Sequence, residues 1–330
     1  MRYLPPLPVF TLSIVLLAAS FTQSANIWAS QGAASEPAAS ERPRLAQVPG
    51  VYRFDVGRFR LSALSDGTLP LDLRVLRGVE PDKLNLLLRK GFVRDPLETS
   101  INAFVVDTGS HLILVDTGAG ELFGKVAGKL PASLAAAGYK PEQITDVLIT
   151  HIHTDHSGGL VRDGRMVFPN ATIHIAREDV DFFLDRENLV KGLELRHHEE
   201  AVKTVQPYLD AGRVKPFSGE TPLLRGVTAL PARGHTPGHS FFRVESDGQS
   251  IEFWGDIMHV GPVQFPRPDV TITFDVDQDA ARTQRAAQFA RGADGRALVA
   301  VAHLPFPGLG YLRRSGAAYD WVPMLYRDRD

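Results

Sequence analysis

Alternating apolar and polar positions predict β-hairpins along the folded part of the chain. The segment YRFDVGRFRLSALSDG alternates with period two around Val56-Gly57, and the strands INAFVVD and HLILVD flank the turn Thr108-Gly109-Ser110. This period places successive side chains on opposite faces of a strand, and the glycines suit the turns between strands. A third hairpin is predicted in FFRVESDGQSIEFWGD, where Asp247-Gly248 separates two apolar runs.

Helix-like segments and short apolar runs alternate with these hairpins. Buried strands are predicted at residues 144–150 (ITDVLIT) and 171–176 (ATIHIA), and a last strand, ALVAVAH, ends at His303. Helices are predicted at residues 122–137, where Pro131 breaks the pattern, and at residues 178–186, 194–211 and 277–291. The chain therefore reads as an α/β fold whose strands deliver polar residues at their carboxyl ends, where such folds place their sites.

The amino-terminal region has a different character. Arg2 is followed by an apolar run at residues 9–19 and then by small residues, which predicts a signal peptide over residues 1–30. An uncleaved membrane anchor is the alternative, but the run is short for a membrane span. Residues 31–48 are rich in Ala, Ser, Pro and Glu and predict a flexible leader before a folded domain at 49–330. We expect a periplasmic or secreted protein without stable membrane association after signal removal.

Composition and charge narrow the function classes. The formal net charge is only −2, so there is no overall positive field that would hold nucleic acid. The chain has no cysteine, which excludes disulfides, thiolate metal sites and a cysteine nucleophile. Any metal ion must therefore be bound by histidines and carboxylates.

Four potential metal ligands lie within six positions directly after the strand at residues 144–150. On an extended segment, His151 and His153 point to the same side and can converge on one ion. If the chain turns into a helix near Thr154, Asp155 and His156 reach a neighbouring position that can serve a second ion. Imidazole and carboxylate ligands suit zinc, and manganese, cobalt or iron remain possible.

Three more candidates stand at the ends of distant apolar strands. Each alone could be an ordinary buried polar residue, but together with the first cluster they predict a dinuclear site. We assign one ion to His151, His153 and His235, the other to Asp155, His156 and His303, and a bridging role to Asp256.

This order of residues resembles the metallo-β-lactamase superfamily and, within it, the methyl parathion hydrolase-like branch. The resemblance runs from Val51 to Trp321 and rests on ALSDG, PLETS, VDTGAGELFG, ITHIHTDHSGGL, PFSG, GHTPGH, WGDI, VQF and AHLPFPGLGYL. It implies an αββα sandwich with a two-metal site along one edge and the same division of ligands. Asp116 would lie behind the ligands, or it would cap backbone N–H groups in a turn.

Two cations that share a water molecule explain the chemistry expected here. Zinc can lower the pKa of bound water to about 7, and a pair of ions can hold a bridging hydroxide while polarising the substrate oxygen. We expect Asp155, Asp256 and His259 at the reaction centre, where His259 either protonates a leaving alkoxide or lines the pocket. His239 is expected to support the His235 loop.

The expected substrates are small neutral esters, either organophosphate triesters or lactones. The resemblance implies pocket walls at Leu71, Phe123 and Phe183, although both phenylalanines could equally belong to the core. His197 is a further candidate for the pocket, at a position where the branch has a phenylalanine; it could equally be a solvated helix residue. Alternatives are a glyoxalase II-like thioesterase, a β-lactamase-like hydrolase and a noncatalytic binding module. The true β-lactamases of this superfamily usually lack a bridging aspartate, so Asp256 argues against the second alternative. The resemblance also implies a possible homodimer.

Overall fold

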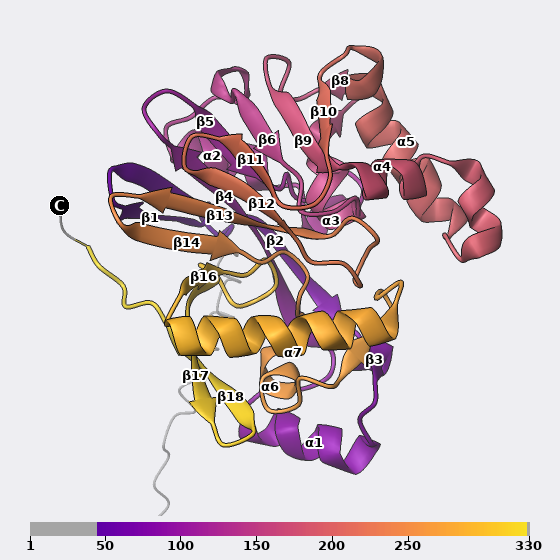
Figure 1. Cartoon of the computed structure of the whole chain (residues 1–330), viewed down its shortest axis with the longest axis vertical. Coiled ribbons are helices and arrows are strands. Elements are labelled where there is room, and N and C mark those ends of the chain that lie inside the picture. The colour runs from indigo at the N-terminus through magenta and orange to yellow at the C-terminus, as the bar shows by residue number, and fades with distance from the viewer. Residues whose placement is uncertain (1–44, 329–330) are drawn as a thin grey trace, which may run out of the picture. The chain divides into compact units, whose positions relative to one another are not determined.

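The computed structural model describes residues 45–328, which include two seven-stranded sheets (Figure 1). The predicted signal peptide and most of the predicted leader lie outside the described residues. The first sheet has the strand order β1 (Val51–Val56), β2 (Phe59–Leu71), β4 (Leu97–Asp107), β5 (Leu112–Val115), β6 (Asp146–Leu148), β9 (Thr172–Ala176) and β10 (Val214–Phe217). Its β1 to β5 pairs are antiparallel, and β5, β6, β9 and β10 run parallel.

The second sheet is largely antiparallel, with one parallel pair formed by β14 and β16. Its strand order is β11 (Thr221–Leu224), β12 (Val227–Pro231), β13 (Ser240–Ser246), β14 (Gln249–Phe253), β16 (Leu298–Ala300), β17 (Leu309–Ser315) and β18 (Ala318–Pro323). Two short pairs complete the strands: β3 (Leu76–Arg77) with β15 (Thr271–Ile272), and β7 (Val161–Arg162) with β8 (Arg165–Met166).

Helices cover the outer faces of the two sheets. The α-helices are α1 (Pro81–Lys90), α2 (Leu130–Ala136), α3 (Thr154–Ser157), α4 (Arg177–Phe183), α5 (Leu195–Asp210), α6 (Gly261–Gln264) and α7 (Gln278–Gly295). Short 3-10 turns lie at Leu73–Val75, Gly124–Val126, Pro141–Gln143, Gly158–Leu160 and Arg186–Lys191. Helices α2, α4 and α5 pack on the first sheet and α7 packs on the second, so the predicted αββα order is confirmed (Figure 1).

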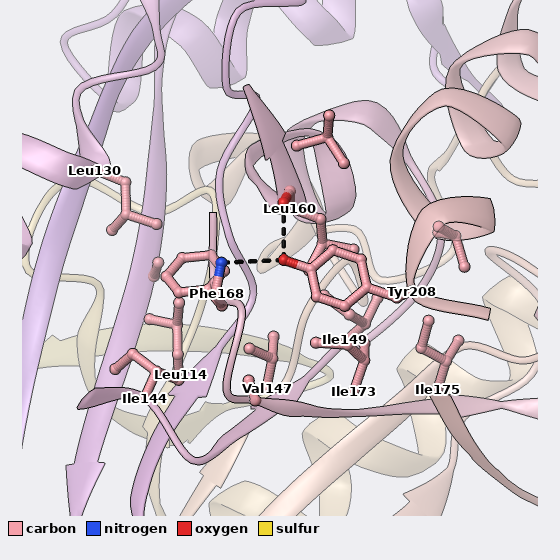
Figure 2. Packing of buried hydrophobic residues seen from close by; sticks show 14 of the residues in the cluster. Leu114, Leu130, Ile144, Val147, Ile149, Leu160, Phe168, Ile173, Ile175 and Tyr208 are labelled. Atoms are coloured by element: carbon pink, nitrogen blue, oxygen red, sulfur yellow. Dashed lines mark hydrogen bonds between the residues drawn. The ribbon is translucent and has the colours of Figure 1, made fainter. Parts of the chain in front are cut away.

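The central strands of the two sheets are buried on both faces, which explains their long apolar runs. In β4, Ala103 and Val105 face the helices, whereas Phe104 and Val106 face the second sheet. Figure 2 shows the core on the helix side, where the Tyr208 hydroxyl donates to the Leu160 carbonyl at 2.9 Å and accepts from the backbone N–H of Phe168. These two hydrogen bonds satisfy the buried hydroxyl.

The three predicted hairpins agree with the structure, as do β6, β9 and helices α4, α5 and α7 to within a few residues. The strand predicted to end at His303 is β16, but it is not the last strand, because β17 and β18 follow it. Pro131 does not break a helix; it stands in the first turn of α2, where its missing N–H costs nothing. Helix α1 was not predicted. Asp277 caps α7 as expected and accepts backbone N–H groups at 2.9 and 3.1 Å. Among the described residues, no helix is long and apolar enough to cross a membrane.

Parallel strand pairs bring the candidate site residues to one edge. In the second sheet Phe253 of β14 is in register with Ala300 of β16, and Asp256 and His303 each follow three residues later. In the first sheet β6 runs parallel to β5, so the segment that begins at His151 leaves the sheet beside the carboxyl end of β5. The carboxyl ends of strands from both sheets therefore supply the site.

Candidate metal centre

The first group of candidate ligands contains three histidines and one carboxylate. His153 Nδ1 lies 3.1 Å from His151 Nε2 and 3.0 Å from His235 Nε2. Asp256 Oδ2 lies 3.5 Å from His151 Nε2 and 3.2 Å from His235 Nε2. All four side chains are buried, and their candidate ligand atoms lie within 4.8 Å of one another.

The second group lies on the other side of Asp256. Helix α3 begins at Thr154 and carries Asp155 and His156, and His303 enters from the end of β16. Asp256 Oδ1 lies 3.1 Å from His156 Nε2 and 3.0 Å from His303 Nε2, while Asp155 Oδ2 lies 3.7 and 3.5 Å from the same two nitrogens. The structure thus brings together the two groups named from the sequence, and each oxygen of Asp256 faces one of them.

Three buried side-chain atoms of these residues and of His259 make no hydrogen bond of acceptable geometry among the described residues. They are His156 Nε2 and Asp256 Oδ1, although these lie 3.1 Å apart, and His259 Nδ1. Leaving a buried polar atom unpaired is costly, so such atoms call for a ligand. Five imidazoles and two carboxylates without sulfur form a donor set that fits zinc and other divalent transition metals.

Hydrogen bonds behind the histidines orient the nitrogens that face the centre. The outer nitrogens contact Asp116 Oδ2 (His156, 2.9 Å), Asp275 Oδ1 (His235, 2.8 Å), the Ser100 carbonyl (His303, 2.9 Å) and Thr150 Oγ1 (His151, 3.0 Å). Where an oxygen accepts the proton of one ring nitrogen, the lone pair of the other nitrogen is free for a metal.

Asp116 combines the two roles considered for it. One oxygen accepts from the backbone N–H of Thr150 at 2.8 Å, as a turn aspartate would, and the other contacts His156. Its φ of 57° is in the left-handed region, where Asp and Asn are the best-tolerated residues besides glycine. The turn therefore places the carboxylate directly behind a candidate ligand.

His239 positions Asp256 rather than facing the pocket. Its Nδ1 donates to the Ala232 carbonyl at 3.0 Å, and its Nε2 accepts from the backbone N–H of Asp256 at 3.0 Å. Burial lowers the pKa of His239 to about 3, which keeps the ring neutral for this arrangement. A Cβ on Gly255, whose φ is +49°, would lie 2.7 Å from His239 Nε2, so this approach requires glycine.

Charge at the centre is concentrated on Asp256. Burial opposes ionisation of this residue, but the surrounding imidazoles hold its pKa well below the usual range. Burial lowers the pKa values of His151 and His153 well below normal. Burial also opposes protonation of His235, yet hydrogen bonds to Asp256 and Asp275 raise its pKa to about 9. Protons and metal ions therefore compete for the same nitrogens.

A pocket of about 210 Å³ opens beside these groups. Leu71, Phe123 and His197 line it, as expected from the sequence, and His259 lies in its wall with Nε2 3.0 Å from Asp256 Oδ2. The remaining lining residues include Leu69, Thr99, Arg196 and Phe274.

Phe183 does not line the pocket, so its predicted role is wrong. It is 0% exposed and belongs to the core between the first sheet and its helices. Its ring contacts the edge of the His153 imidazole, with centroids 5.5 Å apart. Because α4 packs on the outer face of the sheet, Phe183 reaches the centre from behind a ligand.

Sequence reasoning missed two carboxylates that support the centre. Asp179 accepts from the backbone N–H of Ile152 at 3.0 Å and from Thr236 Oγ1 at 2.9 Å, which ties the two histidine loops together. Asp275 holds His235. Neither belongs to a short motif, because each acts on residues 27 to 57 positions away.

Residues 97–303 match the metallo-beta-lactamase superfamily and include all seven candidate ligands. The chain belongs to this superfamily. Among solved members, hydrolase AbOPH in the beta lactamase superfamily is 35% identical, with a TM-score of 0.82 over 86% of this chain and 100% of that chain.

Other proteins with related sequences are described as lactonases. AidC, a dizinc quorum-quenching lactonase solved with the product N-hexnoyl-L-homoserine, is 28% identical, with a TM-score of 0.77 over 85% of this chain and 99% of that chain. An N-acyl homoserine lactonase from Bacillus thuringiensis is 26% identical over 170 residues, 46% of this chain. The alignment spans only 60% of that lactonase's length.

Proposed function

We propose that this protein is a dinuclear metal-dependent hydrolase of small neutral lactones and esters, including organophosphate triesters, in the methyl parathion hydrolase-like branch. The observation that carries the proposal is the position of Asp256. Its two oxygens face two separate groups of imidazoles at 3.0 to 3.5 Å, as a carboxylate that bridges two cations requires.

The donor set supports zinc as the resident metal. His151, His153 and His235 would hold one ion, Asp155, His156 and His303 the other, and Asp256 both. Bound there, two divalent cations would supply a nucleophile from water near neutral pH and polarise the oxygen of the ester. The chain itself offers no cysteine for covalent catalysis.

The pocket supports small neutral substrates. Leu69, Leu71, Phe123 and Phe274 give it apolar walls close to the centre, which would exclude water around the reacting group. Arg196 is the only arginine or lysine in the lining, and its Nε already pairs with Glu200 at 2.8 Å. A thioesterase that recognises the carboxylates or phosphates of a large thiol would need more free cations than this.

His259 is proposed as the proton donor to the leaving group. The ring is buried in the pocket wall, where Nε2 lies 3.0 Å from Asp256 Oδ2. Leaving alkoxides of high pKa need such a proton, whereas a nitrophenolate does not. Two relatives with lactonase descriptions favour lactones as the first substrates to examine.

Metal content and turnover test the proposal together. Purified protein is expected to contain two divalent ions per chain and to hydrolyse acyl-homoserine lactones, paraoxon-type triesters or both. The variants Asp256→Ala and His151→Ala should lose bound metal and at least about 10³-fold of the rate. His111→Ala is the matched control, because this histidine pairs with Asp146 away from the centre. Metal-replete protein that binds these compounds without turning them over would instead be a binding module.

We also propose export to the periplasm or beyond. The support is the signal-like pattern of residues 1–30, with Arg2 before the apolar run at 9–19. Amino-terminal sequencing of protein recovered from a periplasmic extract should find a chain that begins after this run. Protein retained in the cytoplasm with an intact amino terminus would contradict the proposal.

A further inference from the structure

One arginine is completely buried beneath the metal centre. Arg285 of α7 is 0% exposed, and its guanidinium contacts the loop after β14 and the residues on either side of β15. Nε donates to the Ile257 carbonyl at 2.6 Å, and Nη1 donates to the Val270 carbonyl at 2.6 Å. Nη2 lies 3.4 Å from Asp275 Oδ2. A single side chain thus contacts two backbone carbonyls and one carboxylate.

Each of these contacts connects Arg285 to a different residue of the candidate metal centre. Ile257 follows Asp256 directly in the chain, so its carbonyl fixes the backbone beside the bridging carboxylate. Asp275 binds Arg285 with one oxygen and His235 Nδ1 with the other, the latter at 2.8 Å. The same carboxylate accepts the backbone N–H of Ile272 at 3.1 Å, which leaves it little freedom to rotate.

The third contact leads to His259. The Val270 carbonyl that accepts Arg285 Nη1 also accepts Gln264 Nε2 at 3.1 Å. Gln264 Oε1 in turn accepts the backbone N–H groups of His259 and Val260 at 2.7 and 2.9 Å. The loop that bears Asp256 and His259 is therefore held at Ile257 and again at His259 and Val260.

The geometry requires an arginine at this position. A buried guanidinium is expensive unless its donors are paired, and the planar fork can reach several acceptors at fixed angles. A lysine ammonium is a single point of charge, which cannot reach the Ile257 carbonyl, the Val270 carbonyl and Asp275 together. Replacement by lysine would keep the positive charge and lose the arrangement.

We propose that Arg285 is a positioning residue that sets the relative placement of His235 and Asp256, and thereby the affinity of the ion site formed with His151 and His153. This role rests on the proposed dinuclear function. The site formed by Asp155, His156 and His303 shares only Asp256 with these contacts and should be affected less.

Metal affinity measured without substrate tests this role. Chelator competition should show that Arg285→Met and Arg285→Lys weaken one of the two sites by about 10- to 100-fold, the range typical for residues that hold metal ligands. With Co²⁺ in place of the native metal, the absorption of that site should change in the same variants. Phe289→Leu is the matched control, since Phe289 is equally buried one turn later in α7 and packs on Trp254, Phe265 and Tyr319.

The outcomes separate a positioning role from general destabilisation. If Arg285→Lys folds and retains wild-type affinity at both sites, the proposal is overturned. The same conclusion follows if Phe289→Leu weakens metal binding as much as Arg285→Met at equal loss of thermal stability. Wild-type protein that binds two ions and hydrolyses no ester would refute the proposed function, while the affinities would still decide the role of Arg285.

Discussion

Replacing Asp116 by Asn should weaken metal binding without disturbing the backbone. Asn tolerates the left-handed φ of 57° about as well as Asp, so the turn after β5 should remain. The carboxylate accepts from the backbone N–H and hydroxyl of Thr150 and from His156 Nδ1, at 2.8 to 3.1 Å. An amide has only one acceptor oxygen and cannot serve all of these donors.

The cost follows from the two possible orientations of the amide. If its oxygen stays on the Thr150 N–H, the NH₂ group faces His156 Nδ1, and the imidazole must move its proton to Nε2, the atom that faces the centre. The loss of one charge-assisted hydrogen bond is worth about 1.5–3 kcal/mol. Metal affinity should then fall by about 10- to 100-fold. In the opposite orientation a buried N–H of Thr150 is unpaired, which lowers the stability of the fold by about 1–3 kcal/mol.

Chelator competition and thermal unfolding measure the two effects, and Asp146→Asn is the control. Asp146 lies in β6, is buried, and contacts His111 and His174 at 2.8 Å each, so its amide has the same deficit of acceptors away from the centre. The control should lose stability and keep its metal affinity. Our account is refuted if Asp116→Asn binds both ions as the wild type does, or if Asp146→Asn weakens them equally.

Three further predictions concern the pocket and the protonation of the site. His259→Ala should reduce turnover of substrates with poor leaving groups by about 10²-fold and spare p-nitrophenyl substrates, and an equal loss for both would exclude the acid role. Phe183→Ala should cost about 3–5 kcal/mol of unfolding free energy with an unchanged preference between lactones and triesters, whereas Phe123→Ala should change that preference. In metal-free protein the raised pKa of His235, about 9, contributes stability that is fully present below pH 6.5 and is lost as the pH rises through 9. Thermal unfolding between pH 6.5 and 9.5 should show this loss, up to about 3 kcal/mol, and an unchanged midpoint would contradict it.

The candidate ligands could be found from the sequence because each stands at a strand end or in a dense motif. Period-two alternation located the hairpins, and the segment after β6 placed four ligands within six residues. Phe183 was misplaced because an aromatic residue near a ligand can face the pocket or the core, and only the packing of α4 decides this. Asp275 and Arg285 do not stand in a recognisable sequence motif. Their partners, His235 and Ile257, are 40 and 28 positions away in the chain and come close only after folding.

The centre joins two sheets that each carry only part of it. The first sheet supplies His151, His153, Asp155 and His156, and the second supplies His235, Asp256 and His303. Without metal, Asp256 is the counter-charge for imidazoles from both sheets, as its lowered pKa indicates. Since neutral imidazoles are needed for metal binding, cations would take over the role that protons have at His235 and His156. The buried supports, such as Asp275 and Asp116, therefore matter before any ion arrives, because they fix which nitrogen of each ring faces the centre.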